Sequence, residues 1–202
     1  MIMEDGGKYE GELRLNKPHG MGTYTSKLLK YTGEWKDGEW DGQGECVYTD
    51  GIIYKGQYFR NRKHGIGTLT IPKVSTYTGE WQDDFKHGQG TEKFNTGSSY
   101  KGGYCKGLKH GKGKVTFADP KDYFEGEFQN DLKHGFGTMQ LPTFRFEGNW
   151  KHDLKEGHGR CVWKNGDVFE GAYQNDLPEG EGSFKSKTKE QSGKVVNGFF
   201  HG

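Results

Sequence analysis

The chain has 202 residues, of which only 30% are hydrophobic, 14% are aromatic and 35 are glycines. Its 29 lysines and arginines balance 28 aspartates and glutamates, which leaves a net charge of +1. A disordered chain of such low hydrophobicity would carry a large net charge, and a nucleic-acid-binding protein would carry a basic excess, so the balanced charge argues against both classes.

Targeting and redox features favour a protein of the reducing cytoplasm. No apolar run reaches the roughly 18 residues of a membrane-spanning helix. Residues 1–8 lack the apolar segment of a secretory signal. The three cysteines, Cys46, Cys105 and Cys161, lie far apart and form no Cys-x-x-Cys pair. We therefore expect a cytoplasmic protein.

One motif recurs along nearly the whole chain. An aromatic residue, a glycine two positions later and a second aromatic residue two positions after that begin each copy, as in Tyr31, Gly33 and Trp35, and a Gly-x-Gly such as Gly42-Gln43-Gly44 closes it. A fixed period of this size predicts a repeat architecture. The leading glycines, spaced 22 to 24 residues apart, are Gly11, Gly33, Gly56, Gly79, Gly102, Gly126, Gly148 and Gly171.

This spacing sets the predicted domain organisation. We expect a lead-in over residues 1–8 before the repeats, a polar linker over 185–195 after them, and a partial ninth repeat over 196–202. The eight predicted repeats span residues 9–30, 31–53, 54–76, 77–99, 100–123, 124–145, 146–168 and 169–184.

Each repeat reads as one β-hairpin. Tyr31, Gly33 and Trp35 are two positions apart, so on a strand they share one face. Segments such as Lys36–Gly38 within a copy and Asp50–Gly51 between copies have the composition of tight turns. Hairpins stacked edge to edge predict an all-β fold: an elongated, single-layer, twisted antiparallel sheet about 75 Å long.

The pattern of these copies, Tyr/Phe-x-Gly-x-Trp/Tyr/Phe followed by His-Gly-x-Gly, resembles the MORN (membrane occupation and recognition nexus) repeat family over roughly residues 9 to 184. The resemblance implies a stand-alone repeat protein that acts as a scaffold. Such proteins are commonly cytoskeletal or ciliary assembly components, including subunits of flagellar radial spokes. Two alternatives also follow from the resemblance: a membrane-associated module that binds phosphoinositides or other acidic lipids, and a regulatory repeat subunit of an enzyme complex.

Repetition argues against a catalytic or metal site. Equivalent side chains in adjacent hairpins lie about 10 Å apart, too far to share a zinc ion. The histidines before Gly-x-Gly are therefore expected to close the turn, and the glutamates of the first strand to form a solvated face, so we predict no enzyme activity, cofactor or metal. These residues are His19, His64, His87, His110 and His134, with Glu12, Glu34, Glu80 and Glu127.

An aromatic stripe is the strongest candidate for a partner site. These rings are the only core that the sheet has, yet a single sheet should leave part of its apolar face uncovered, which predicts a groove for a protein partner. The groove residues are Tyr31, Trp35, Tyr54, Tyr58, Tyr77, Trp81, Tyr100, Tyr104, Phe124, Phe128, Phe146 and Trp150.

A lysine row precedes the turn glycines of five copies. Cations about 10 Å apart could meet acidic lipid headgroups or an acidic protein surface, and the alternative is that they are solvated loop lysines. The row comprises Lys63, Lys86, Lys109, Lys133 and Lys155.

The last residues carry a further expectation. Val196, Phe199 and Phe200 resemble the first half of a hairpin, and an unpaired apolar strand needs a cover. We expect another chain, either a second copy or a different protein, to supply it. The predicted partners are thus proteins, with acidic lipid as the alternative and no nucleic acid.

Overall fold

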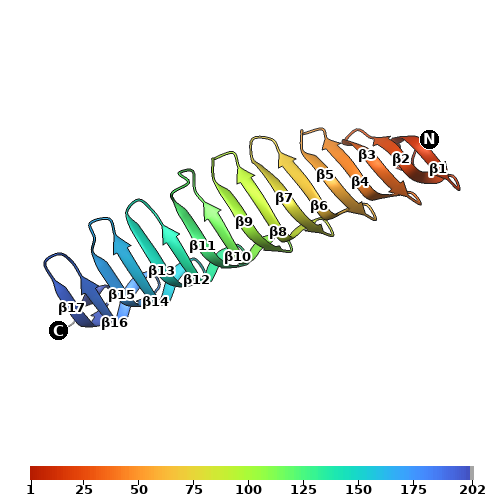
Figure 1. Ribbon diagram of the computed structural model, residues 1–202. Helices are drawn as coiled ribbons and strands as arrows, with labels where there is room; N and C mark the ends of the chain where they lie inside the picture. The colour runs from red at the N-terminus through yellow and green to blue at the C-terminus, as the bar shows by residue number, and fades with distance from the viewer. Residues whose placement is uncertain (201–202) are drawn as a thin grey trace. The chain divides into compact units, whose positions relative to one another are not determined.

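The computed structural model describes residues 1–200, apart from the side chain of Phe200, and every regular element in that part of the chain is a β-strand (Figure 1). Within residues 1–200 no helix has the length and apolarity needed to cross a membrane. The prediction of an all-β chain of stacked hairpins is confirmed. The strands are β1 (Lys8–Arg14), β2 (Lys17–Thr25), β3 (Leu29–Lys36), β4 (Glu39–Tyr48), β5 (Ile53–Phe59), β6 (Arg62–Ile71), β7 (Ser75–Gln82), β8 (Phe85–Phe94), β9 (Ser99–Cys105), β10 (Leu108–Thr116), β11 (Tyr123–Gln129), β12 (Leu132–Gln140), β13 (Phe144–Lys151), β14 (Leu154–Trp163), β15 (Val168–Gln174), β16 (Leu177–Lys185), β17 (Glu190–Val196) and β18 (Phe199–Phe200).

The chain divides into two compact units. The first unit comprises Met1–Thr96 and Tyr104–Gly107, and the second comprises Gly97–Gly103 and the residues from Leu108 onward. In each unit consecutive strands pair antiparallel, so each hairpin is followed by the next one in the same sheet. Because no helix is present among the described residues, the side chains of each sheet must supply its core.

The register aligns the glycines of successive strands. Gly33 of β3 faces Gly44 of β4, and Gly44 faces Gly56 of β5. The Tyr31 ring lies over the first two of these, because a Cβ added at Gly44 would come 2.5 Å from a ring carbon of Tyr31. The Tyr31 hydroxyl donates a hydrogen bond to the carbonyl of Glu34 at 2.9 Å. The glycines are needed here because they let the ring lie along the backbone at close approach.

The hairpin turns have the predicted positions. Within a repeat, Asp37 and Gly38 have φ values of 52° and 98°, and Asn130 is at 50°, as two-residue primed turns require. Between repeats, the Gly51 N–H donates to the carbonyl of Tyr48 at 2.9 Å. The turns therefore reverse the chain within two to four residues, except for the six-residue loop 117–122 between β10 and β11, and the aromatic faces of successive hairpins stay in register.

At five hairpin tips a reciprocal hydrogen bond joins the hairpin to the preceding one. The N–H of Asp131 donates to the carbonyl of Lys109 at 3.0 Å, and the Asp131 carboxylate accepts the Lys109 N–H at 2.9 Å. The bond fixes the spacing of neighbouring hairpins at their tips. The same two-way bond joins Asn61 to Trp40, Asp84 to Lys63, Asp153 to Lys133 and Asp176 to Lys155.

Glycine replaces the Asp or Asn at some tips. The N–H of Gly38 donates to the carbonyl of Pro18 at 2.9 Å, and Pro18 has no N–H that would need a side-chain acceptor. The two positions are thus matched. Gly198, whose N–H donates to Pro178, repeats this match, whereas the glycine tip at Gly107 donates to Lys86, which has an N–H of its own.

The C-terminal region differs from the prediction. Residues 190–195, expected to belong to a polar linker, form most of β17, which pairs with β16. Its Val195 is fully buried and takes the place of the second aromatic residue of the motif. The ninth hairpin therefore begins at Glu190, and Asn197 with Gly198 forms its turn. Residues 201–202 of the predicted partial repeat lie outside the described residues.

We predict that Gly44→Ala destabilises the protein, because the new methyl group would overlap the Tyr31 ring. Overpacking of this kind costs about 1–3 kcal/mol. Urea unfolding monitored by circular dichroism measures the loss. Gln43→Ala, at the exposed neighbouring position, is the matched control and should change stability little. Equal stability of the two variants would contradict the account of the ring and glycine contact.

We also predict that the first unit loses its structure at a lower alkaline pH than the second. Burial raises the pKa of Tyr31 and Tyr54 above the ordinary tyrosine value, and that of Tyr48 to about 12. A raised pKa in the folded state means that this stability is present below about pH 10 and is lost as pH rises through the folded pKa. In the second unit burial also raises the pKa of Tyr100, to about 12, and that of Tyr173, but the leading rings Phe124, Phe146 and Phe169 do not ionise, so fewer buried groups titrate there.

The measurement is ¹⁹F NMR of 5-fluorotryptophan-labelled protein between pH 9 and 12. The signals of Trp35 and Trp81 should change before that of Trp150. Tyr54→Phe should raise the midpoint of the first unit. A single common midpoint that this variant does not move would contradict the prediction.

Candidate functional site

An aromatic ladder runs along one face of each sheet. Tyr31 meets Trp35 of its own hairpin edge-on at 5.4 Å and Tyr58 of the next hairpin at 5.2 Å between ring centroids. In the second unit Phe124 meets Phe128 at 5.3 Å and Trp150 at 5.3 Å in the same way. Edge-to-face contacts of this kind add to the free energy of ring burial.

The ladder is more buried than an open groove would allow. All of its rings have relative exposures of 5% or less, because the leading rings lie over glycines and the second rings pack edge-on against them. The expectation that a single sheet leaves them uncovered therefore differs from the structure. Partner binding against them stays a prediction, and a partner could touch only their edges. The ladder residues are Tyr31, Trp35, Tyr54, Tyr58, Tyr77, Trp81, Tyr100, Tyr104, Phe124, Phe128, Phe146 and Trp150.

The lysine row lies on the ladder. The Lys133 ammonium is 5.8 Å from the Phe124 ring centroid, 5.1 Å from that of Trp150 and 3.1 Å from a carboxylate oxygen of Asp153. Burial pushes the pKa of Asp153 upward, but the hydrogen bonds and charge of Lys133 outweigh this and hold the pKa below its ordinary value. The row is therefore half-buried and is not a set of solvated loop lysines. Lys63, Lys86, Lys109 and Lys155 also lie over ladder rings, at 5.0 to 5.7 Å from the centroids.

Trp40 takes the place of a lysine in the second hairpin. Its ring stacks on Tyr31 at 4.2 Å between centroids, with an angle of 5° between the planes, and meets Trp35 edge-on at 6.2 Å. Trp40, Trp35, Tyr24 and Asp5 help to line a cavity of about 470 Å³ in the first unit. A hydrogen bond from the Tyr24 hydroxyl holds the pKa of Asp5 below its ordinary value, so this cavity has an anionic edge.

Beside the ladder lies a second, half-exposed strip, which we call the loop-side band. Each repeat has one residue of its second strand that pairs with a leading ring, and we call this position the ring-facing column: Tyr24, Cys46, Leu69, Glu92, Val115, Met139, Cys161 and Phe184. The loop-side band occupies the position two residues beyond this column, next to the loops between repeats. Side chains two positions apart on a strand share a face, so the band lies on the same face as the ladder. Extending the alternating pattern by two residues beyond the column would have predicted the band from the sequence. The loop-side band is Tyr48, Ile71 and Phe94 in the first unit and Phe117, Leu141 and Trp163 in the second.

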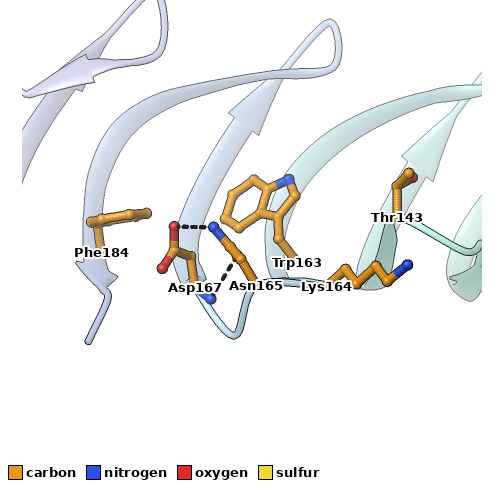
Figure 2. Close-up of a pocket in the computed structure, with 6 residues that line it drawn as sticks. All are labelled: Thr143, Trp163, Lys164, Asn165, Asp167 and Phe184. Carbon is orange, nitrogen blue, oxygen red and sulfur yellow. Dashed lines mark hydrogen bonds between the residues drawn. The ribbon is translucent and has the colours of Figure 1, made fainter.

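The band ends in the second unit at a pair of rings with space between them. The Trp163 and Phe184 centroids are 6.5 Å apart, and their planes are tilted by 55°. Figure 2 shows the two rings on either side of a cavity of about 450 Å³, which Asn165 and Asp167 also line. A second cavity of about 490 Å³, toward Phe199, is also lined by both Trp163 and Phe184, together with Lys189. Sequence reasoning missed this pair.

Eight segments match the model of the MORN repeat. The matches cover residues 9–27, 31–53, 54–73, 77–99, 100–119, 124–143, 146–168 and 169–189.

The chain belongs to the MORN repeat family.

This repeat is non-enzymatic, and it generally mediates interactions with proteins or membranes. A comparison with curated proteins gives no match. Each matched repeat corresponds to one of the hairpins described above, so each repeat contributes one leading ring, one glycine pair and one hairpin tip.

The histidine position of the MORN unit serves the next hairpin. His19 Nδ1 accepts the N–H of Asp37, in the following turn, at 3.4 Å, and Glu179 accepts the N–H of Asn197 at 2.8 Å. The side chain at this position thus contacts the turn of the next repeat. The sequence suggests that it closes the turn of its own repeat, and the structure differs from that expectation. The remaining predicted histidines, His64, His87, His110 and His134, hold the same position, and Nδ1 of His64 and of His134 is buried without a hydrogen-bond partner within residues 1–200.

The glutamate ladder also has a structural contact. Glu34 accepts the N–H of Gln43 at 2.9 Å, and Glu80 accepts that of Gln89 at 2.7 Å. Each carboxylate spans the bulge where the second strand of its hairpin has a glycine at positive φ. Among the described residues no group of three or more His, Cys, Asp or Glu side chains is placed to hold a metal ion.

Glu92 is the charged exception in the ring-facing column. It is 7% exposed and accepts hydrogen bonds from Ser75 Oγ at 3.0 Å, Lys86 Nζ at 2.6 Å and the Tyr104 hydroxyl at 3.2 Å. The donors come from three different strands, which explains how the sheet tolerates a charge at this depth.

Two other residues of the column, Cys46 and Cys161, are buried, and burial raises the pKa of both thiols, as expected for inert core cysteines.

The C-terminal residues are only partly described. Val196 is half-buried, Phe199 is 74% exposed, and the side chain of Phe200 lies outside the described residues. Self-association through these residues stays a prediction.

We predict that Glu92→Leu destabilises the first unit by about 3 kcal/mol, because it leaves the Lys86 ammonium without its anion. The double variant Glu92→Leu/Lys86→Met should recover most of the loss, since Leu69 shows that the column accepts leucine. Urea unfolding of the single and double variants measures the coupling.

Glu125→Leu is the matched control, because Glu125 pairs with Lys114 at 2.9 Å on the exposed surface. It should cost no more than about 1 kcal/mol. Equal losses at positions 92 and 125, or additive losses in the double variant, would count against the buried network.

Proposed function

We propose that the chain is a non-catalytic scaffold that binds protein partners through the loop-side band. The band is the part of the apolar face that stays accessible, and that observation carries the proposal. In the first unit it presents Tyr48, Ile71 and Phe94 from β4, β6 and β8, in consecutive hairpins. Half-exposed aromatic and aliphatic residues in a row are typical of protein interaction surfaces.

The buried ladder supports this role physically. Rings wedged over glycines and lysines held over the rings leave the sheet little conformational freedom beneath the band. A rigid surface loses less entropy when a partner binds, so a modest apolar area gives useful affinity. Repeat number then sets how many hairpins a partner can contact in each unit.

The cellular setting is a separate part of the proposal. We propose a cytoplasmic, cytoskeleton-associated protein, with a place in cilia or flagella as a radial-spoke-like assembly component. The support is the makeup of the chain, in which MORN repeats account for most residues.

Acidic lipid is the alternative ligand, and the lysines weigh against it. The ammonium groups of Lys63, Lys86 and Lys133 lie within 4 Å of the carboxylates of Asp84, Glu92 and Asp153. Their charge is therefore largely neutralised within the protein, and little is left to attract an anionic headgroup.

The test compares two double variants of the full chain expressed in cells. Tyr48→Ser/Phe94→Ser changes the band, whereas Met21→Ser/Ile66→Ser changes exposed residues of the opposite face, which are 55% and 57% exposed. The band variant should lose captured partners by at least about tenfold, because two apolar contacts contribute about 1.5 kcal/mol or more each. Quantitative affinity purification measures the loss.

A photocrosslinking amino acid at position 94 provides a second readout if the band variant unfolds, and the same amino acid at position 66 is its control. Crosslinks mainly from position 66 would contradict the proposal. So would co-sedimentation with phosphoinositide vesicles that persists in moderate salt and depends on the lysine row, because it would favour the lipid alternative.

A further inference from the structure

Trp163, Phe184 and Asp167 bring two rings and a carboxylate together at the end of the loop-side band. All three side chains are half-buried. The Asp167 carboxylate projects into the space between the two rings (Figure 2). Its Oδ2 accepts a hydrogen bond from Asn165 Nδ2 at 2.8 Å, while the Asp167 N–H donates to Asn165 Oδ1 at 3.0 Å. These two bonds hold the carboxylate in place, and Oδ1 accepts no hydrogen bond from the described residues 1–200.

The same set of groups occurs elsewhere in the chain with a cation bound. At Lys133, a phenylalanine ring and a tryptophan ring 5.3 Å apart hold an ammonium, and the Asp153 carboxylate contacts it. Lys63 lies 5.7 Å from both the Tyr54 and Trp81 centroids, with Asp84 at 3.7 Å. The protein thus contains occupied examples of a site built from two rings and a carboxylate.

The site at Trp163 lacks the cation. Within residues 1–200 no lysine or arginine places its charged group over either the Trp163 or the Phe184 ring. Lys164 lines the same cavity, but Figure 2 shows its side chain extending away from the two rings. The rings are 6.5 Å apart, against 5.3 Å at the occupied Phe124 and Trp150 pair, so the opening is wider where the cation is missing.

We propose that Trp163, Phe184 and Asp167 form a binding site for a lysine or arginine side chain of a protein partner. Rings attract a cation through their faces, and Asp167 Oδ1 accepts an N–H bond from it. An ammonium or guanidinium has such N–H groups, whereas the quaternary ammonium of a choline headgroup has none. The cation is taken to belong to a protein, so the proposal rests on the scaffold function in that respect.

The experiment uses the full chain labelled with 5-fluorotryptophan, with the Trp163 signal assigned from Trp163→Phe. The probes are N-acetyl-lysine methylamide and N-acetyl-arginine methylamide, titrated while ¹⁹F shifts are recorded. The Trp163 signal should move saturably with both. N-acetyl-norleucine methylamide, which has a similar apolar chain and no charge, should not move it.

Two variants test the groups. Asp167→Asn keeps the hydrogen bonds with Asn165 but removes the charge, and it should weaken binding at least about fivefold. Phe184→Leu should weaken it by about threefold through loss of one ring. Asp122→Asn is the matched control, since Asp122 holds the equivalent position two repeats earlier, where Phe117 stands in place of Trp163 and Met139 in place of Phe184, and it should leave the titration unchanged.

Equal binding of the norleucine probe would overturn the proposal, because it would identify an apolar pocket only. Tighter binding of the trimethyl-lysine analogue or of phosphatidylcholine vesicles, unaffected by Asp167→Asn, would overturn it in favour of a choline headgroup. No natural partner enters this titration, so its result stands apart from that of the Tyr48 and Phe94 variants, which leave Trp163 and Asp167 intact.

Discussion

In each of the eight repeats the leading tyrosine or phenylalanine ring lies over two facing glycines of its own hairpin. This contact lets a sheet bury a core without a second layer, because the ring fills the space that two Cβ atoms would take. The second ring of the motif can then meet leading rings of two hairpins edge-on, and the lysines can lie over them. Burial to 5% or less follows, although only 30% of the residues are hydrophobic.

The same arrangement decides what remains for function. The ladder rings are tightly packed and expose little surface of their own. The loop-side band beside them is therefore the surface that a partner can contact. The lysines take part in the core, which removes them as a free cationic surface. Two features that seemed separate in the sequence, the aromatic stripe and the lysine row, are thus one structure in which cations and carboxylates close the open side of the ladder.

Much of the fold could be predicted from the sequence, and much less of the site. The glycine period and alternating aromatics specify hairpins and register, because turns and side-chain direction are local properties. Ring burial was misjudged because alternation assigns Tyr31 to a face but does not tell whether its ring stands off the sheet or lies along it. The network around Glu92 could not be predicted either, because its donors Ser75, Lys86 and Tyr104 come from separate strands. The pairing of Trp163 with Phe184 likewise depends on neighbouring strands whose residues are far apart in the chain.

The bonds at the hairpin tips have a consequence for how such a chain can change. A tip with Asp or Asn suits a preceding hairpin that has an N–H to offer, as at Asp131 and Lys109, whereas the proline of a hairpin suits a glycine tip, as at Pro18 and Gly38. Repeats are therefore not freely interchangeable building blocks. Duplication, deletion or reordering of hairpins would be tolerated best where it preserves these pairings between adjacent hairpins. The order of the repeats therefore depends in part on whether each tip residue suits the hairpin before it.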